Sequence, residues 1–243
     1  MTPARLIDLF SSVSAAVRSE LDELVDWGPA PGHSGQYQHD VVADDVAVPM
    51  LLEAGLGVVS EESGQHSVDR DVVAVIDPID GSTNASIGLP WYATSIAAVD
   101  ADGVLASLVV NQALGVTYTA IRGEGAWRDG ASISPSTCVD LSDAIVVVND
   151  LPPPLGTRQF RVYGAAALDI CAVADGTFDG FVDCGVGLAP WDYYGALLVC
   201  LEAGVAVGTV EGAELVENEY DRRLQVVVGS TAPIRDGLRK AVA

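Results

Sequence analysis

Hydrophobic and polar residues alternate at helical spacing near the N-terminus and at strand spacing further along the chain. Apolar positions three and four residues apart predict an amphipathic helix over about residues 3–27. A polar, glycine-containing loop follows over residues 28–36, and a second helix is expected over about residues 43–54, kinked or restarted at Pro49. The short apolar segment 58–60 predicts a strand that ends at two glutamates.

Short apolar runs bounded by turn residues follow and predict strands over 72–76, 92–99, 104–111 and 115–121. Asp102-Gly103 marks a hairpin between two of them, and residues 127–130 form another turn. After residue 144 the pattern alternates, with strands expected over 144–149, 160–163, 178–182, 205–210 and 224–229. Helices are expected over 165–174, 191–203 and 233–242. We therefore predict an α+β half over residues 1–135 and an α/β half over residues 136–243, joined as one compact unit.

Composition excludes several classes of protein. The 243 residues are 49% hydrophobic, which is typical of a globular protein with a sizeable core. A net charge of −22 argues against binding nucleic acid through a basic face. No apolar run reaches the length of a membrane span and the N-terminus lacks signal-peptide features, so we expect no membrane association and a cytoplasmic location. The four scattered cysteines suit a reducing compartment.

The segment Asp77-Pro78-Ile79-Asp80-Gly81-Ser82-Thr83-Asn84 is the most informative for function. It places two carboxylates three residues apart at the end of an apolar run, where they repel each other and are costly to desolvate unless a cation binds. Oxygen ligands suit Mg²⁺ or Mn²⁺, and a helix that starts after Gly81 offers backbone N–H groups to a phosphate. The alternative is a type I turn with Pro78 at its second position.

Three further acidic groups lie at the ends of predicted elements. Glu61 and Glu62 end the strand before Asp77, and Asp192 begins the apolar helix 191–203. Asp44 and Asp45 lie at the start of the second helix. Taken alone, the glutamates could be solvated surface residues and the aspartates could be helix caps. Taken together, acids at four element ends favour a metal and phosphate site.

These segments, in this order, resemble the inositol monophosphatase family of Mg²⁺-dependent, lithium-sensitive phosphatases, and the resemblance covers nearly the whole chain. Residues 77–82 are similar to the family's D-P-[IL]-D-G-[TS] signature, residues 60–63 to its G-E-E-S segment, and residues 190–196 to its W-D-x-x-[AG]-[AG] signature. Segments 41–47, 164–168 and 202–204 are similar to further family motifs. The resemblance implies a layered α/β/α/β/α sandwich, of the type shared with fructose-1,6-bisphosphatase, and a homodimer.

The resemblance also implies roles for individual residues. It assigns a first metal to Glu61, Asp77 and the Ile79 carbonyl, and a second metal to Asp77, Asp80 and Asp192. A third ion would lie near Glu61 and Glu62. The backbone N–H groups of Gly81, Ser82 and Thr83 would bind the phosphate. Ser82, paired with Asp45, would orient or deprotonate the attacking water, although the choice between Asp44 and Asp45 stays open.

The substrate-contacting positions depart from the family pattern. Ala165, after Gly164, stands where Ser or Thr is common, and Asp183 stands near a usual Glu. We expect a Mg²⁺-dependent phosphomonoesterase, with Mn²⁺ possible and Li⁺ inhibitory, acting on inositol 1-phosphate or a similar small polyol or sugar phosphate. Alternative substrates are histidinol phosphate, fructose 1,6-bisphosphate and 3′-phosphoadenosine nucleotides. Arg158 and Arg161 are candidates for binding the second phosphate of fructose 1,6-bisphosphate. A catalytically idle, metal-binding regulator is the alternative outside enzymes.

Overall fold

The structure, a computed structural model, describes residues 1–32, 35–216 and 220–243. His33 and Ser34 of the predicted polar loop lie outside these residues. The helices in the described part are α1 (Pro3–Glu23), α2 (Gln38–Glu53), α3 (Ser82–Ser86), α4 (Ala166–Ala174), α5 (Pro190–Ala203) and α6 (Ala232–Val242), with a short 3-10 helix at Leu141–Asp143.

The strands form two sheets. The eight strands of the first are β1 (Gly57–Ser60), β2 (Gly64–His66), β3 (Val73–Asp80), β4 (Ala93–Asp100), β5 (Gly103–Asn111), β6 (Thr117–Ile121), β7 (Gly125–Arg128) and β8 (Ala131–Ser132). Their order is β2-β1-β3-β4-β5-β6-β7-β8. The five strands of the second are β9 (Ile145–Val148), β10 (Gln159–Arg161), β11 (Gly180–Val182), β12 (Ala206–Thr209) and β13 (Val226–Gly229), in the order β10-β9-β11-β13-β12.

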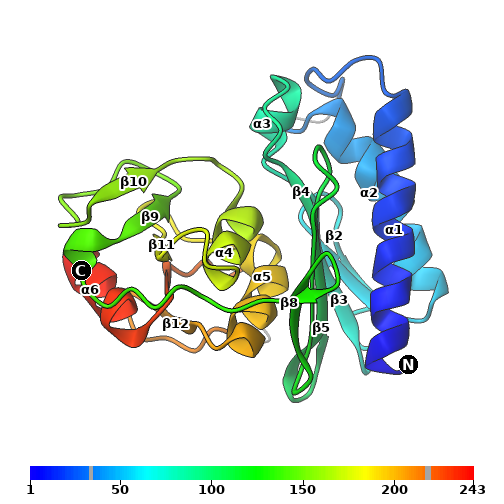
Figure 1. The fold of residues 1–243 in the computed structure, drawn as a ribbon. Helices are drawn as coiled ribbons and strands as arrows, with labels where there is room; N and C mark the ends of the chain where they lie inside the picture. Colours follow the sequence, from blue (N-terminus) through cyan, green and yellow to red (C-terminus); the bar gives the residue numbers. More distant parts are fainter. Residues whose placement is uncertain (33–34, 217–219) are drawn as a thin grey trace.

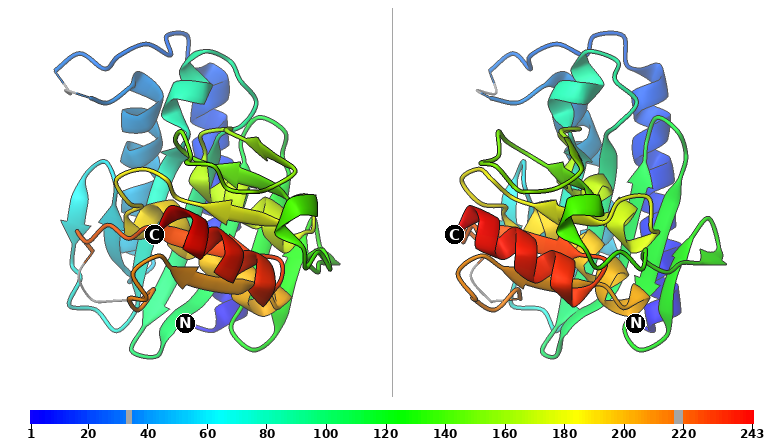
Figure 2. Two further views of the ribbon diagram at one scale, coloured as in Figure 1. Left: turned by 90° about the vertical axis from the view of Figure 1, so that its left-hand side faces the viewer. Right: turned by 60° about the vertical axis from the view of Figure 1, so that its left-hand side comes forward.

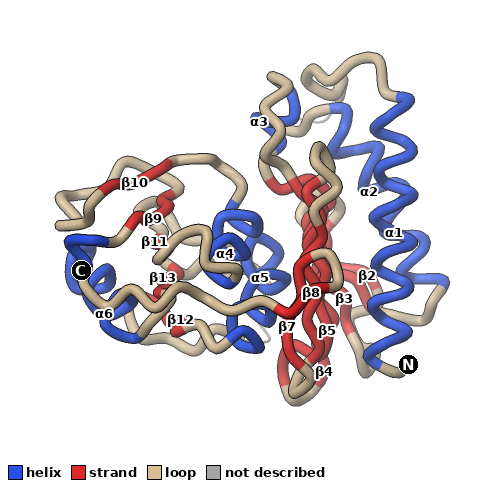
Figure 3. The backbone as a smooth tube through the Cα atoms, viewed as in Figure 1, coloured by secondary structure: helices blue, strands red, loops and turns tan. Residues whose placement is uncertain are grey.

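Helices and sheets stack in five layers (Figure 1). Helices α1 and α2 pack on one face of the first sheet, and α4 and α5 pack on its other face. The second sheet lies beyond α4 and α5, and α6 covers its outer face (Figure 2). Figure 3 shows the strands of the first sheet between the two helical layers. The predicted layered sandwich is confirmed, and the predicted boundary near residue 135 falls between β8 and β9.

Three clusters of buried apolar residues hold the layers together. One joins α1 and α2 to the first sheet through residues such as Phe10 and Ile76. The largest fills the space between the two sheets, around α4 and α5, with Tyr193 and Phe181 among its largest members. A smaller cluster joins α6 to the second sheet. Because α4 and α5 touch sheets on both sides, their residues are buried all round and their sequences are almost entirely apolar.

Several predicted boundaries differ from the observed ones. Helix α2 begins at Gln38, five residues before the predicted start, and runs through Pro49 without a break. The predicted turn at 127–130 belongs in part to β7, and β2 was not predicted. Strand β3 was expected to end at Ile76 and instead continues to Asp80.

The extension of β3 explains how its two acids are placed. The pairing of β3 with β4 shifts register between Asp77 and Asp80, where Pro78 interrupts the ladder. The Thr94 hydroxyl donates to the Pro78 carbonyl at 2.8 Å and holds this irregular segment against β4. In a regular strand, residues three apart point to opposite faces. The bulge changes that relation, and the motif stays in the sheet while it turns toward α3.

Gly195 allows α5 to lie close to the first sheet. A Cβ atom at this position would lie 2.5 Å from Ser95 Oγ and 3.1 Å from Val109 Cγ2, so a side chain would push α5 away from β4 and β5.

We expect Gly195→Ala to lower the free energy of unfolding by about 1–3 kcal/mol, measured by urea denaturation. Gly208→Ala in β12 is the matched control, because the nearest atom to its Cβ would be Arg235 Cδ at 3.6 Å. Equal effects of the two substitutions would contradict the close-packing explanation.

Candidate functional site

Two parallel strands bring Glu61 and Asp77 together. Strands β1 and β3 pair in parallel with Ser60 opposite Ile76, and the Glu61 N–H donates to the Ile76 carbonyl at 3.2 Å. The next residue on each strand is the acid, so Glu61 and Asp77 leave the same edge of the sheet side by side. The carboxyl ends of parallel strands are a common location for ligand sites in α/β proteins.

Asp192 completes a group of three carboxylates. It lies in the first turn of α5, where its Oδ2 accepts the Ala189 N–H at 2.7 Å, so it is also the helix-capping acid that the alternative interpretation proposed. One oxygen from each of Glu61, Asp77 and Asp192 lies within 4.8 Å of the other two. Three of the predicted metal ligands, from two strands of one sheet and a helix of the other half, therefore converge.

Asp80 lies beside this group but faces another element. Its Oδ1 accepts the Ala166 N–H at 3.1 Å and its Oδ2 accepts the Ala167 N–H at 2.7 Å, so the carboxylate binds the N-terminus of α4. Each oxygen keeps a second lone pair that could reach a cation. Asp80 thus links β3 to α4, and the charge of Asp192 acts on it directly.

The turn after Asp80 is closely packed. Gly81 has φ +89, and a Cβ atom there would lie 3.0 Å from both the Ala165 Cβ and the Trp91 carbonyl, so glycine is required. The Ser82 hydroxyl donates to the Ile79 carbonyl at 2.8 Å. Helix α3 follows, with Thr83 exposed in its first turn. The predicted phosphate-binding residues Gly81, Ser82 and Thr83 therefore form one turn next to the Asp77 and Asp80 carboxylates.

Burial and mutual repulsion raise the pKa values of five carboxyls in this region. Burial, followed by the charges of Glu61, Asp80 and Asp192, raises the pKa of Asp77 well above its usual range. Burial and the Asp192 charge do the same to the pKa of Asp80. Burial, then Glu61, raises the pKa of Asp192 to about 7, and burial, then Asp40, raises the pKa of Glu62 to about 7. Burial likewise raises the pKa of Glu61.

The donor set fits a hard divalent cation. All the converging atoms are oxygens, and their raised pKa values show that they lack the positive charge that would stabilise their ionised forms. A cation among Glu61, Asp77 and Asp192 would supply it. Zinc prefers nitrogen and sulfur ligands, whereas oxygen ligands suit Mg²⁺ or Mn²⁺.

The acid predicted to pair with Ser82 needs a correction. Asp45 is exposed on α2, whereas Asp44 is buried and accepts the Ser60 hydroxyl in a short hydrogen bond. Asp40, which the sequence analysis did not single out, is only 2% exposed and its charge raises the pKa of both Glu61 and Glu62. Because the predicted helix began at residue 43, Asp40 fell in a loop. An acid three residues after the N-cap residue, here Tyr37, is the signal that could have found it.

Asp40 is tied to the Gly81 turn through its neighbour His39. The Asp40 Oδ2 accepts the Tyr37 N–H at 2.8 Å, and its buried Oδ1 has no hydrogen-bond partner among the described residues. The fully buried His39 ring lies between the Trp27 and Tyr37 rings, at 5.1 Å from each. Its Nε2 lies 3.2 Å from the Ser82 carbonyl oxygen and 3.4 Å from the Asp40 Oδ1. The start of α2 therefore contacts the turn that follows Asp80.

The predicted substrate contacts lie in the second half of the chain. Gly164 and Ala165 pack on Gly81, at the start of α4. Asp183, at the end of β11, is fully buried, with its Oδ1 accepting the Gly185 N–H at 2.8 Å and its Oδ2 unpartnered among the described residues. Its charge acts on Asp192. Gly164 and Ala165 line the turn directly, and Asp183 lies behind the Asp192 side of the site.

Arg223 was not predicted and is close to the carboxylates. Its Nη1 lies 3.6 Å from the Asp192 Oδ2, and its charge also lowers the pKa of Glu61. No motif surrounds this arginine in the sequence, so only the folded chain reveals it.

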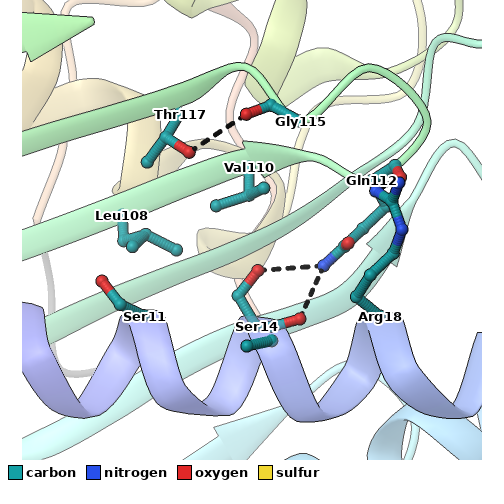
Figure 4. Close-up of a pocket in the computed structure, with 9 residues that line it drawn as sticks. Ser11, Ser14, Arg18, Leu108, Val110, Gln112, Gly115 and Thr117 are labelled. Carbon is teal, nitrogen blue, oxygen red and sulfur yellow. Dashed lines mark hydrogen bonds between the residues drawn. The ribbon is translucent and has the colours of Figure 1, made fainter. Parts of the chain in front are cut away.

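A separate hollow of about 350 Å³ lies on the other side of the first sheet, between α1 and β5 (Figure 4). The Gln112 amide donates to the Ser14 hydroxyl at 2.9 Å and to the Ser14 carbonyl at 3.2 Å, which fixes α1 to the end of β5. None of the carboxylates of the candidate site lines it. We interpret it as a packing gap between α1 and the hairpin of β5 and β6.

Comparison with known proteins agrees with the geometry of the carboxylates. A family model described as "Inositol monophosphatase family" matches residues 52–240. The fructose-1,6-bisphosphatase/inositol-1-monophosphatase of Archaeoglobus fulgidus is 33% identical over 199 residues, which cover 79% of this chain and 77% of that protein. The chain belongs to the inositol monophosphatase family.

Other relatives carry different names. The Nus factor SuhB of Escherichia coli is 33% identical over 207 residues, 76% of each chain. Among solved structures, the extragenic suppressor protein suhB of Bartonella henselae is 27% identical with a TM-score of 0.83, and the alignment covers 98% of this chain and 99% of that one. Membership of the inositol monophosphatase family therefore indicates a phosphatase and leaves the substrate open.

A membrane span needs a helix that is both long and strongly apolar, and none of the helices in the described part of the chain meets both conditions.

The raised carboxyl pKa values predict how the metal-free protein responds to pH. In the unfolded chain these groups ionise near pH ~4, so between that pH and their folded pKa values the folded state holds protons that the unfolded state has released. The protonated carboxyls therefore contribute to the free energy of unfolding at low pH. This contribution is lost as the pH rises through their folded pKa values, which are about 7 for Asp192 and Glu62. With EDTA, we expect Tm to fall by roughly 5 °C or more from pH 6.5 to 8.5.

Added Mg²⁺ should restore most of this loss at pH 8.5, because the cation neutralises the same carboxylates. Asp192→Asn should show a smaller fall in Tm than the unmodified protein. Thermal unfolding followed by circular dichroism measures both. The interval starts at pH 6.5 because burial lowers the pKa of His39, and most of the opposite, stabilising effect of this group has been gained once the pH reaches the unfolded histidine pKa of about 6.5. A Tm that stays constant or rises over this interval in EDTA would contradict the electrostatic account.

Proposed function

We propose that this member of the inositol monophosphatase family is a Mg²⁺-dependent phosphomonoesterase that acts on a small phosphorylated polyol or sugar, with inositol 1-phosphate as the first candidate. The observation that supports it is the convergence of Glu61, Asp77 and Asp192 within 4.8 Å beside the turn at Gly81. Carboxylates alone would repel a phosphate, so the site needs cations to bind one.

Metal ions in such a site polarise the phosphate and make water a better nucleophile at neutral pH. In our proposal Glu61, Asp77, Asp80, Asp192 and the Ile79 carbonyl hold these ions, with Glu62 near a third. The N–H groups of Gly81, Ser82 and Thr83 bind and orient the phosphate, and the close packing of Ala165 on Gly81 keeps the turn fixed.

Proton transfer from the attacking water requires a base close to the site. The sequence analysis assigned this role to Asp45 through Ser82, and we now assign it to Asp40. Its Oδ1 is buried and accepts no hydrogen bond from the described residues, although His39 Nε2 lies 3.4 Å away, and its charge reaches both Glu61 and Glu62. The Ser82 hydroxyl, which donates to the Ile79 carbonyl, fixes the backbone next to that position.

The relatives support two substrate classes. The Archaeoglobus fulgidus relative is named for the hydrolysis of both fructose 1,6-bisphosphate and inositol 1-phosphate, so both compounds are candidate substrates of this chain. Histidinol phosphate would need an acidic pocket, to which the buried Asp183 could contribute, and 3′-phosphoadenosine nucleotides are a further candidate. Dependence on Mg²⁺, with Mn²⁺ possible, inhibition by Li⁺, a homodimer and a cytoplasmic location stay predictions.

The second candidate function is regulation without catalysis, which the name of the Escherichia coli relative, Nus factor SuhB, keeps open. A protein that no longer catalyses the reaction would not need all of its metal-binding residues. Glu61, Asp77, Asp80 and Asp192 are all present in this sequence, and we therefore favour the enzyme.

Hydrolysis by the purified protein tests this proposal. With Mg²⁺ or Mn²⁺ we expect phosphate release from at least one of inositol 1-phosphate, fructose 1,6-bisphosphate, histidinol phosphate and 3′-phosphoadenosine 5′-phosphate. Asp77→Asn should lower kcat by about 10³-fold or more, because one ligand to both metals is lost. The same variant should raise Tm in EDTA at pH 8.5, since it removes one of the repelling charges, and this shows that the variant folds. No turnover on the whole panel would exclude the enzyme.

Substitution of two aspartates on α2 tests which of them is the base that accepts the proton from the attacking water. Asp40→Asn should lower kcat by about 10²- to 10⁴-fold, with little change in the Mg²⁺ concentration needed for half-maximal activity. Asp45→Asn is the matched control, because Asp45 is exposed on the same helix, and its kcat should stay within about twofold of the unmodified protein. Steady-state phosphate release measures both. The reverse result would return the role to Asp45.

A further inference from the structure

A single guanidinium lies at the carboxylate group, in a protein with only 12 lysines and arginines. Arg223 Nη1 is 3.6 Å from Asp192 Oδ2, and its charge also reaches Glu61. About half of the Arg223 side chain, 47%, is exposed, so the guanidinium is accessible from solvent. It is therefore both close to the site and able to receive a ligand.

The backbone around Arg223 is fixed by the loop that precedes α5. Leu188 and Leu224 form an antiparallel bridge with two hydrogen bonds of 2.9 Å. Gly187, at φ +95, lies so close that a Cβ atom there would be 3.0 Å from the Arg223 Cβ. The Arg223 Nη1 also donates to the Gly187 carbonyl at 3.3 Å. These contacts direct the arginine toward the site and hold its Cα in place.

A role as a counter-ion for Asp192 does not account for this arrangement. When cations bind Glu61, Asp77 and Asp192, the carboxylates lose most of their attraction for the guanidinium, and the cations repel it. Arg223 then needs another anion. A guanidinium has five donors in a planar fork that fits a phosphate or a carboxylate with two hydrogen bonds.

The substrate is the anion that arrives together with the cations. Its reacting phosphate lies, in our proposal, at the turn of Gly81, which belongs to the first half of the chain. Arg223 approaches the carboxylates from the second half, beside Asp192 and the loop that carries Asp183. The two anion-binding features therefore come from different halves, and a substrate with two anionic groups could contact both.

We propose that Arg223 is a specificity-determining residue that binds a second anionic group, a phosphate or a carboxylate, on a small phosphomonoester. This inference rests on the proposed phosphatase function. It favours a substrate such as fructose 1,6-bisphosphate over inositol 1-phosphate, which has no second anionic group.

The arginines that the sequence suggested for a second phosphate lie on or just before β10, the edge strand of the second sheet. Arg161 lies on β10, the edge strand of the second sheet, where it donates to the Phe160 carbonyl and to Gln159 Oε1 at 2.9 and 2.7 Å. The Arg158 N–H donates to the Ala144 carbonyl just before β10. Arg161→Gln is therefore a suitable control that removes one positive charge without touching the carboxylates.

The test compares kcat and KM for fructose 1,6-bisphosphate, 2-phosphoglycerate and inositol 1-phosphate in the unmodified protein, Arg223→Gln, Arg223→Lys and Arg161→Gln. We expect Arg223→Gln to lower the ratio of kcat/KM for the preferred dianionic substrate to that for inositol 1-phosphate by about 10- to 100-fold, mainly through KM. Arg223→Lys should recover part of the ratio, and Arg161→Gln should leave it unchanged. The dianionic substrate that shows the effect identifies the second group as phosphate or carboxylate.

Other outcomes overturn the proposal in distinguishable ways. If the unmodified protein hydrolyses neither these three substrates nor histidinol phosphate and 3′-phosphoadenosine 5′-phosphate, the phosphatase function itself fails. If it hydrolyses them and Arg223→Gln lowers kcat/KM equally for all three, Arg223 acts through Asp192 rather than on the substrate. A changed Mg²⁺ concentration for half-maximal activity would accompany that result. A loss of the ratio in Arg161→Gln instead would transfer the second-anion site to β10.

Discussion

Repulsion among the carboxylates of Glu61, Asp77, Asp80 and Asp192 is the constraint on which the rest of the site depends. Four acids this close, of which Asp77 and Asp80 are buried and Asp192 is partly buried, cannot all ionise without compensating charge, and burial and this repulsion raise their pKa values. The fold compensates in part with helix ends. Asp192 lies in the first turn of α5, Asp80 accepts two N–H groups of α4, and Asp40 lies in the first turn of α2. Three positive helix termini thus face the acids, and cations supply the rest.

The layered architecture brings these acids to one place. The parallel pairing of β1 with β3 sets Glu61 beside Asp77, and the register shift after Asp77 carries the chain past Pro78 toward α4. Gly195 brings α5 against β4 and β5, so that its first turn reaches the edge of the sheet. A metal site assembled from both halves would hold those halves together, since Asp77 and Asp80 come from the first half and Asp192 from the second. Metal binding and folding are coupled in such a site.

The sequence was informative where chemistry is local and less so where it depends on tertiary contacts. Asp77 and Glu61 each follow an apolar run and Asp192 begins one, and the structure brings these three together. Helix starts are harder to predict, because Gln38 begins α2 without a Ser, Thr, Asp or Asn cap before it. That error of five residues moved Asp40 out of the predicted helix, so the sequence analysis considered only Asp44 and Asp45 for the role that we propose for Asp40. Strand β3 was predicted too short because proline usually ends a strand, while a bulge keeps Pro78 within this one.

Arg223 shows the limit of motif analysis most clearly, since its importance depends on two backbone segments that are far apart in sequence. Residues 187–188 and 223–224 meet as an antiparallel bridge, and only this contact places the guanidinium beside Asp192. The rest of the protein is strongly acidic, so an approaching phosphate ester is repelled except where bound cations and this arginine reverse the local field. In our proposal, the motifs determine which bond is broken. The charge of Arg223, on the opposite side of the carboxylates, would then determine which esters stay bound long enough for that reaction.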